Sequence, residues 1–213
     1  MKYYPVFLAL SGKKAVIVGG GRVAERKAAA LIKAGAIVEV VSPAITKVLG
    51  DYRKKGLIRH KRKNYEKADL KGAFIVIAAS SSIETNSQVN RDARQLVNVV
   101  DTPSEGNFIT PSIVRRGPLT IAISTEGGSP AVSKAIRKEI ESLYGPEFSK
   151  YLRFAGKIRK EAMSVIKDSR ERERFLKGLA SEDILDTLRN KGLKTVLKKY
   201  SLKPGGGRVR KPS

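Results

Sequence analysis

The chain has 213 residues, of which 41% are hydrophobic and 30% are charged, the balance of a globular protein and not of a disordered one. It contains no cysteine and a single histidine, His60, which excludes disulfides, thiolate nucleophiles, zinc fingers and iron–sulfur clusters. The formal net charge of +23 is far from ordinary and predicts an acidic partner.

Targeting signals are not recognisable in this sequence. No apolar stretch reaches the roughly 18 residues that a membrane-spanning helix needs. The first residues, MKYYPVFL, have neither the length nor the small-residue cleavage site of a signal peptide. We therefore expect a cytoplasmic protein without a membrane segment.

Short apolar runs alternate with amphipathic stretches from residue 13 to residue 101. Strands are predicted at 15–18, 37–41, 57–61, 74–79 and 96–100, and helices are predicted at 22–34, 44–55 and 84–94. Such alternation is typical of parallel βαβ units with right-handed crossovers. The fold class predicted for this part is α/β, with a Rossmann-type parallel sheet.

The pattern changes after Asp101, where residues 102–130 become rich in Pro, Gly, Ser and Thr. Strands are predicted there at 112–114 and 119–124, and helices are predicted at 131–144, 147–167, 170–178 and 181–199. The end of the chain, 201–213, reads as a flexible basic tail. Residues 150–213 hold 19 Lys and Arg against 7 Asp and Glu, so the helical end carries much of the charge.

The glycine triplet after the first predicted strand is the strongest local motif. Residues 19–24, GGGRVA, fit the G-x-G-x-x-A fingerprint of dinucleotide-binding turns, between a strand and a helix as that fingerprint requires. Gly19 permits the tight turn, Gly21 lets the backbone approach a pyrophosphate, and Ala24 lets helix and strand pack closely. The free N–H groups of the helix start then face the anion. The sequence thus predicts a dinucleotide site.

The end of the second strand bears on which dinucleotide is bound. NAD enzymes usually carry an acidic residue there, but this chain has Ser42 followed by Pro43. Glu39 lies inside the strand and is not expected to reach the ribose. No arginine follows directly to bind a 2′-phosphate, so NAD is favoured over NADP.

Asp101 follows the last predicted strand of the sheet. Such strand ends line the ligand crevice of an open parallel sheet, where a partly desolvated carboxylate can act as a general base. The alternative is a turn or helix-capping aspartate, because Thr102 and a proline follow. Position alone leaves both interpretations open.

The motifs of several other enzyme classes are missing from this sequence. The chain has no G-x-x-x-x-G-K-[ST] phosphate loop, and no tyrosine is followed four residues later by lysine, as in short-chain dehydrogenases. His60 lies in the basic run RHKRK at 59–63, where we expect a solvated surface side chain. The many other Lys and Arg residues fit solvated helix faces or surface ion-pair networks, although the excess of one sign argues against pure pairing.

Several motifs follow one another in order: PVFL at 5–8, VGGGRVAERK at 18–27, NVVD at 98–101, FITPSIVRRGPLTIAIST at 108–125, GGSP at 127–130 and RKEIE at 137–141. Together they resemble the precorrin-2 dehydrogenase family, which also forms the N-terminal half of bifunctional siroheme synthase. The resemblance runs from residue 4 to residue 179. The first motif corresponds to an N-terminal strand of that family. Many of its members have cysteine where this chain has Gly106.

This resemblance implies an NAD-dependent oxidation of precorrin-2 to sirohydrochlorin, with ferrous iron insertion in some members. It implies a homodimer built from an NAD-binding Rossmann domain (1–110), a dimerisation region (111–146) and a C-terminal helical domain (147–200). It also implies site residues. The pyrophosphate and ribose side of the cofactor would be held by Gly19, Gly21, Arg22, Val23, Ser42, Pro43, Ala44, Ala79 and Ser80. Asp101 would be the active-site carboxylate, and the substrate cleft would include Arg115, Arg116, Ser124 and Thr125.

A carboxylate-rich tetrapyrrole would account for part of the positive charge, since arginine suits bidentate carboxylate contacts. No metal-ligand set is visible, so chelatase activity is left open. Two other functions remain as alternatives. A nucleotide-sensing regulatory module would keep the Rossmann domain without catalysis, and a nucleic-acid-binding protein would use the charge and the basic tail. The sparse aromatic residues and the cofactor turn weigh against nucleic acid as a partner.

Overall fold

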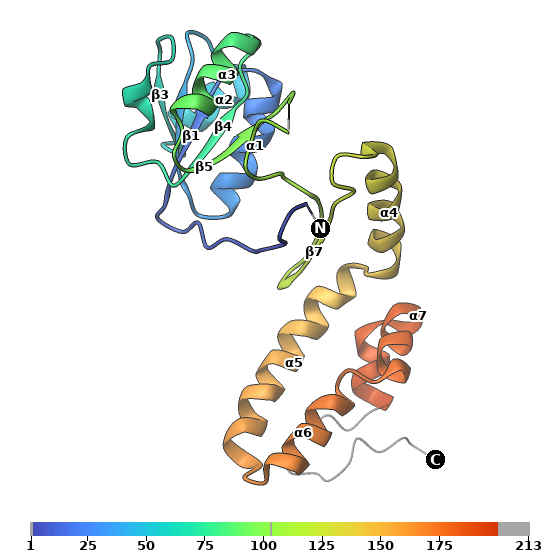
Figure 1. Cartoon of the computed structure of the whole chain (residues 1–213). Coiled ribbons are helices and arrows are strands. Elements are labelled where there is room, and N and C mark those ends of the chain that lie inside the picture. Colours follow the sequence, from blue (N-terminus) through green and yellow to red (C-terminus); the bar gives the residue numbers. More distant parts are fainter. Residues whose placement is uncertain (1, 103, 200–213) are drawn as a thin grey trace. The chain divides into compact units, whose positions relative to one another are not determined.

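The computed structural model describes residues 2–102 and 104–199, so the predicted basic tail at 201–213 lies outside the described residues. The chain divides into two compact units, Met1–Thr110 and Pro111–Ser213. Each unit is described by itself, because their relative positions are not determined (Figure 1).

The first unit contains a five-stranded parallel sheet with the strand order β3-β2-β1-β4-β5. Its strands are β1 (Lys14–Val18), β2 (Ile37–Val41), β3 (Ile58–Lys61), β4 (Ile75–Ala78) and β5 (Leu96–Val99). The helices are α1 (Arg22–Lys33), α2 (Lys47–Lys54) and α3 (Ile83–Asp92), with a 3₁₀ turn, η1, at Lys67–Leu70. The predicted α/β class with a Rossmann-type sheet is confirmed.

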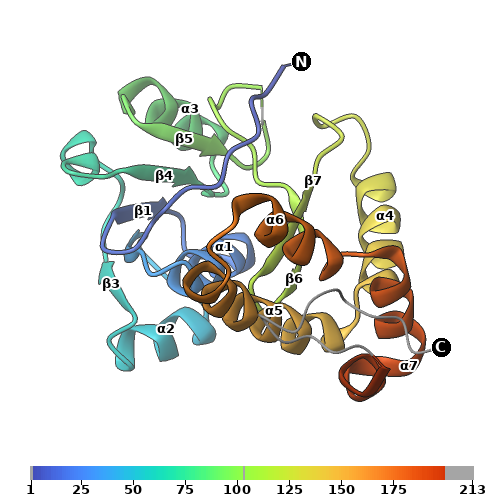
Figure 2. The same cartoon turned by 90° about the horizontal axis from the view of Figure 1, so that it is seen from below.

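Helices cover both faces of this sheet, as Figure 2 shows. Ala24, Ala28 and Leu31 of α1 pack with Leu49 of α2 against one face. Leu70 of η1 and Val89 of α3 pack against the other. The apolar runs of the central strands are continuous because both faces are buried.

Three local features differ from the prediction. The helix expected at 44–55 begins at Lys47, because the Thr46 hydroxyl caps it by accepting a hydrogen bond from Leu49 N at 3.3 Å. The turn η1 was not predicted, since a segment of four residues is too short to show a helical spacing of apolar side chains. Residues 5–8 form no strand and lie outside both sheets, with Phe7 74% exposed, so the strand implied by the resemblance is wrong in this structure.

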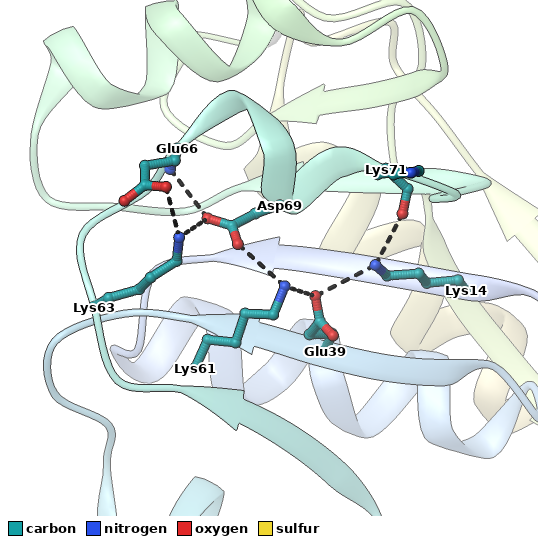
Figure 3. A network of polar contacts seen from close by, with 7 residues as sticks. All are labelled: Lys14, Glu39, Lys61, Lys63, Glu66, Asp69 and Lys71. Carbon is teal, nitrogen blue, oxygen red and sulfur yellow. Dashed lines mark hydrogen bonds and ion pairs between the residues drawn. The ribbon is translucent and has the colours of Figure 1, made fainter.

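A network of ion pairs joins the sheet to η1 (Figure 3). Lys61 Nζ lies 2.9 Å from Glu39 Oε1 and 3.1 Å from Asp69 Oδ1. Lys14 adds a contact of 3.3 Å to Glu39, and Lys63 adds one of 3.2 Å to Asp69. Both carboxylates are buried, and a buried negative charge is tolerated only where positive charges lie beside it. The lysines of this network supply those positive charges. The Glu39 carboxylate is therefore held in ion pairs on the sheet, which agrees with the expectation that it does not reach a ribose.

The second unit contains an antiparallel hairpin, β6 (Ser112–Arg116) and β7 (Leu119–Ile123), and four helices among its described residues. These are α4 (Pro130–Leu143), α5 (Pro146–Val165), α6 (Ser169–Gly178) and α7 (Glu182–Lys199). Phe148, Tyr151 and Ile158 of α5 pack against Ile184 and Leu188 of α7. The predicted single helix at 181–199 is interrupted at Gly192, whose φ of 76° and ψ of 174° are not helical.

The ion-pair network predicts an acid-sensitive contribution to stability. Burial by itself raises the pKa of Asp69, but hydrogen bonds from Lys61, the Glu66 backbone and Lys63 outweigh it and hold this pKa below 3.8. We expect Asp69→Asn to lower the free energy of unfolding by about 2 kcal/mol at neutral pH. Because the pKa is lower in the folded state, this difference should stay constant above pH 5 and shrink as the pH falls below about 3.8.

Urea unfolding at pH 7, 5 and 3 measures this difference. An exposed ion pair outside this network supplies the control: Glu173→Gln removes the partner of Lys177 and should change the free energy of unfolding far less than Asp69→Asn does. A difference between Asp69→Asn and the unsubstituted protein that is as large at pH 3 as at pH 7 would contradict the assignment.

Candidate functional site

The predicted site residues of the first unit follow four different strands. Gly19 follows β1, Ser42 follows β2, Ala79 follows β4 and Asp101 comes shortly after β5. Since all these strands are parallel, the four segments meet at one edge of the sheet. The strand order reverses between β1 and β4, and ligands of open α/β sheets bind at such a switch point.

Gly19 makes the turn at the end of β1. Its φ of +122° is a conformation that side-chain-bearing residues rarely adopt. Its N–H donates to the Val41 carbonyl at 2.9 Å, and Ala79 N donates to the Val18 carbonyl at 2.8 Å. A Cβ on Gly19 would overlap the Ala79 carbonyl group. The structure thus brings together the predicted positions Gly19 and Ala79.

Gly20 also requires glycine, which the sequence analysis missed. A Cβ at this position would overlap the carbonyl oxygen of Ala44 and lie 2.9 Å from the Ser42 hydroxyl. The Gly20 carbonyl accepts a hydrogen bond from Thr46 N at 2.9 Å. The fingerprint treats the middle position as variable, so only the fold reveals that the loop after β2 packs directly on it.

Gly21 is different, because the space beside it is open. It is the N-cap of α1 with φ −84° and ψ −171°, and it provides no side-chain cap. Apart from its neighbours in the chain, no atom of the described residues lies within 4 Å of a Cβ built on it. Arg22 is exposed and Val23 is half-buried at the helix start. A pyrophosphate can therefore approach the amide groups of this turn, and the residues present fit a dinucleotide.

The loop after β2 is held in shape by its own hydrogen bonds. The Ser42 hydroxyl donates to the Ala44 carbonyl at 2.7 Å, while Pro43 and Ala44 are exposed. Thr46 Oγ1 donates to Glu25 Oε2 at 2.9 Å, which ties this loop to α1. At the end of β2 the loop 42–44 therefore presents its backbone, and none of its three side chains is a carboxylate.

The segment after β4 is held by a buried asparagine that the sequence analysis did not single out. Ser80 N donates to Asn86 Oδ1 at 3.0 Å, and Asn86 Nδ2 donates to the Ser80 carbonyl at 3.0 Å. Asn86 is 3% exposed. A buried amide that exchanges two hydrogen bonds with one residue fixes the position of Ala79 and Ser80 beside the glycine turn. The sequence feature that could have identified Asn86 is a polar residue on the face of α3 that packs against the sheet.

Asp101 lies in the loop that follows β5. Its side chain is exposed, and it has no hydrogen-bond or ion-pair partner within 2–102 and 104–199. Asn98 Nδ2 donates to the Phe108 carbonyl at 3.1 Å, and Val97 N donates to Asn107 Oδ1 at 2.8 Å, which closes the two ends of the loop. A Cβ on Gly106 would lie 2.7 Å from the Val97 carbonyl oxygen, so a side chain at this position would require the backbone to shift. The carboxylate is available to a ligand at the sheet edge.

Lys27 connects α1 to this loop. Its Nζ donates to Asn98 Oδ1 at 3.2 Å and to Thr110 Oγ1 at 2.5 Å. Burial, and after it the charge of Arg26, lowers the pKa of Lys27. The helix that begins at the glycine turn is therefore anchored to the strand that leads to Asp101.

The predicted substrate residues of the second unit differ in their availability. Arg116 is engaged: its guanidinium donates to the carbonyl groups of Tyr144 (2.8 Å), Glu141 (3.3 Å) and Arg115 (3.0 Å). It thereby caps the C-terminal end of α4. The Arg115 side chain is exposed, and within the described part of the chain no ion pair is found for it.

The loop between β7 and α4 is braced internally. Thr125 Oγ1 donates to the Ser129 carbonyl at 3.1 Å and accepts from Ser129 N at 3.2 Å. Ser124 Oγ accepts from Glu126 N at 3.0 Å. Ser129 caps α4 through Val132 N. The structure thus places Ser124 and Thr125 in an ordered turn at the start of a helix.

A surface groove of about 500 Å³ in the second unit contains none of the predicted site residues. It is lined by Met163, Ser169, Arg172, Glu173, Leu176, Lys177 and Ala180. Among the described residues no three His, Asp or Glu side chains gather as a metal site would require. Nor does any described helix combine the length and apolar character needed to cross a bilayer.

Comparison with known proteins links both units to one group. A family model described as "Putative NAD(P)-binding" matches residues 6–112. A second, described as "Sirohaem biosynthesis protein central", matches residues 116–143. Siroheme synthase 1 of Aeromonas salmonicida (strain A449) is 38% identical over 188 residues, which are 87% of this chain and 40% of that protein. The siroheme synthase of Methylobacillus flagellatus is 37% identical over 192 residues, 87% of this chain and 41% of that protein.

The chain thus spans about two fifths of the curated relatives that it matches. A solved structure matches over its full length: that of SirC, a precorrin-2 dehydrogenase, superposes with a TM-score of 0.79 at 29% identity, covering 92% of this chain and 100% of that one. The sequence and structural similarities therefore extend beyond the cofactor turn to the second unit.

The two neighbouring glycines should respond differently to the same substitution. Gly21→Ala places a methyl group in open space at a φ that alanine tolerates, so the melting temperature should not change. The methyl group would obstruct a pyrophosphate, and NADH affinity should fall about tenfold. Gly20→Ala overlaps a backbone carbonyl and should also lower the free energy of unfolding, by about 1–3 kcal/mol.

Fluorescence titration with NADH and thermal unfolding measure the two effects separately. Unchanged NADH affinity in the Gly21→Ala variant would show that no phosphate approaches this turn.

Proposed function

Because the chain belongs to the NAD(P)-binding family whose model covers its first unit, we propose that it is an NAD-dependent dehydrogenase that oxidises precorrin-2 to sirohydrochlorin. The observation that carries this proposal is the structural match to the whole chain of a precorrin-2 dehydrogenase, helical unit included. The match of the central siroheme model to residues 116–143 disfavours a lone nucleotide-sensing module.

In this proposal the cofactor is NAD, which accepts the hydride when it is bound. The amide groups at Gly21, Arg22 and Val23 hold the pyrophosphate, supported by the positive end of the α1 dipole. The loop 42–44 contacts the adenosine ribose, and Ala79 and Ser80 line the cofactor on the β4 side. The open space beside Gly21 supports this arrangement.

Asp101 is the group proposed to face the ring of the substrate. Its carboxylate stands free at the same sheet edge as the cofactor turn. There it accepts a proton from the substrate as the hydride leaves, or holds a pyrrole N–H of the macrocycle in place. The closed ends of its loop and the anchor at Lys27 keep it in reach of that edge.

Substrate binding is proposed to use the positive charge of the chain. Precorrin-2 is a tetrapyrrole with many carboxylate side chains, and exposed arginines such as Arg115 suit their bidentate recognition. In the braced turn before α4, the Ser124 hydroxyl only accepts a hydrogen bond and can still donate to a carboxylate, whereas the Thr125 hydroxyl already donates to Ser129 and holds the turn in shape. Arg116 contributes to binding only by supporting this region, because its guanidinium is already engaged.

A homodimer is part of the proposal. The β6–β7 sheet has only two strands, and Ile113 is exposed while its neighbour Val114 is buried. Val132, Ile136 and Leu143 of α4 are also exposed. A two-stranded sheet with exposed apolar side chains is stabilised when a second copy covers it.

The direct test gives the purified protein precorrin-2 and NAD. We expect sirohydrochlorin and NADH to appear in equal amounts, followed by their absorbance. If neither is formed, the proposed function is wrong.

Replacing the carboxylate should separate catalysis from cofactor binding. Asp101→Ala should reduce kcat about a hundredfold, the usual contribution of a positioned acid–base group. NADH affinity should not change, because no residue of the glycine turn is altered. A variant that keeps full turnover would contradict the role of Asp101.

Charge on the exposed sheet should prevent dimerisation. We expect Ile113→Glu to sediment as a monomer in analytical ultracentrifugation, because a carboxylate would be buried in the interface. Met163→Glu alters a similarly exposed apolar residue on α5 and should leave the dimer intact. Identical sedimentation of Ile113→Glu and the unsubstituted protein would place the interface elsewhere.

A further inference from the structure

His60 is not the solvated side chain that the sequence analysis expected. It is half-buried at the end of β3, and its Nε2 lies 2.9 Å from the carbonyl oxygen of Ser42. Its Nδ1 is buried and has no hydrogen-bond partner in the described part of the chain. The prediction is wrong because it judged the residue by its basic neighbours, and not by the face of the strand on which it lies.

The strand register explains this burial. His60 is paired with Val40 of β2, and the Val40 side chain belongs to the core under α1 and α2. The neighbouring residues Arg59 and Lys61 point to the opposite face, since side chains alternate along a strand. His60 therefore turns inward, while Arg59 is exposed.

The hydrogen bond fixes which nitrogen carries the proton. A carbonyl oxygen only accepts, so Nε2 of His60 carries a proton and donates it to Ser42. A buried ring nitrogen without a hydrogen-bond partner has a cost in free energy. Within 2–102 and 104–199 the ring makes one polar contact, which is with the backbone of the loop after β2.

This contact is the first in a series that ends at the glycine turn. Ser42 is held by β3 at both of its backbone groups, since its N–H also donates to the Lys61 carbonyl at 3.1 Å. The Ser42 hydroxyl then holds the Ala44 carbonyl at 2.7 Å, and that carbonyl packs on Gly20. The position of the loop 42–44 beside the turn thus depends on the end of β3.

We propose that His60 is a positioning residue for cofactor binding, which sets the backbone of the loop 42–44 against the adenosine ribose. The inference rests on the proposed function, because it needs a dinucleotide at the glycine turn. His60 acts through Ser42 and touches no reacting group. It therefore affects how tightly the adenosine half of the cofactor is bound and not the rate of hydride transfer.

Two substitutions of His60 by amide side chains of different length, Gln and Asn, test this proposal. Gln places its N–H₂ where His60 has Nε2, whereas Asn places it where His60 has Nδ1, too short to reach Ser42. We expect His60→Asn to weaken binding of NADH and of ADP-ribose about fivefold, the effect of one lost hydrogen bond. His60→Gln should restore both affinities to within about twofold. Arg59→Gln, an exposed change on the same strand, should bind as the unsubstituted protein does.

Kinetics and a cofactor fragment distinguish positioning from a general fold defect. In the His60→Asn enzyme the KM for NAD should rise while kcat and the KM for precorrin-2 stay constant. Inhibition by nicotinamide mononucleotide, which lacks the adenosine half, should not change. If the Asn variant does not fold, His60→Leu, which also lacks the donor, takes its place.

Absence of NADH binding in the unsubstituted protein would overturn the proposed function and this inference with it. Normal NADH binding in the unsubstituted protein and an equal affinity in His60→Asn would overturn the inference alone. An equal loss of affinity for nicotinamide mononucleotide and for ADP-ribose in His60→Asn would also overturn the inference. So would a His60→Gln variant that binds NADH as weakly as His60→Asn does.

Discussion

The close backbone contact between the glycine turn and the loop after β2 is the constraint on which the candidate site depends. A side chain on Gly20 would overlap the Ala44 carbonyl, and one on Gly19 would overlap the Ala79 carbonyl. Three strand ends can therefore meet only if positions 19 and 20 of the turn between β1 and α1 carry no side chains. The next residue, Gly21, lies beside open space, which the approach of a pyrophosphate requires.

The residues around this turn hold it from several directions. Thr46 joins the loop after β2 to Glu25 of α1, and Asn86 fixes the segment after β4. Lys27 extends the connection to the strand that precedes Asp101. The buried ion pairs of Glu39 and Asp69 lie on the opposite face of the sheet from α1 and stabilise the strands themselves. The glycine turn and the Asp101 carboxylate are thus placed by one sheet, which suits the proposed reaction because its main requirement is alignment.

Much of the fold could be predicted, because its signals are local. Continuous apolar runs such as Ile75–Ala78 indicate strands buried on both faces, and the glycine triplet indicates the turn. The features that were missed depend on contacts between residues far apart in sequence. The need for glycine at position 20 comes from Ala44, the inward orientation of His60 comes from the register with β2, and the engagement of Arg116 comes from the end of α4. Residues 5–8 were assigned to a strand by resemblance alone, and in this structure they pair with neither sheet.

A crystal structure of the protein with NAD tests the central claim most directly. If this claim is right, the pyrophosphate lies against the backbone at Gly21 and the first amides of α1, with the loop 42–44 beside the adenosine ribose. The nicotinamide should lie on the side of the sheet edge that Asp101 occupies. Density for NAD at any other place, with the space beside Gly21 empty, would contradict it.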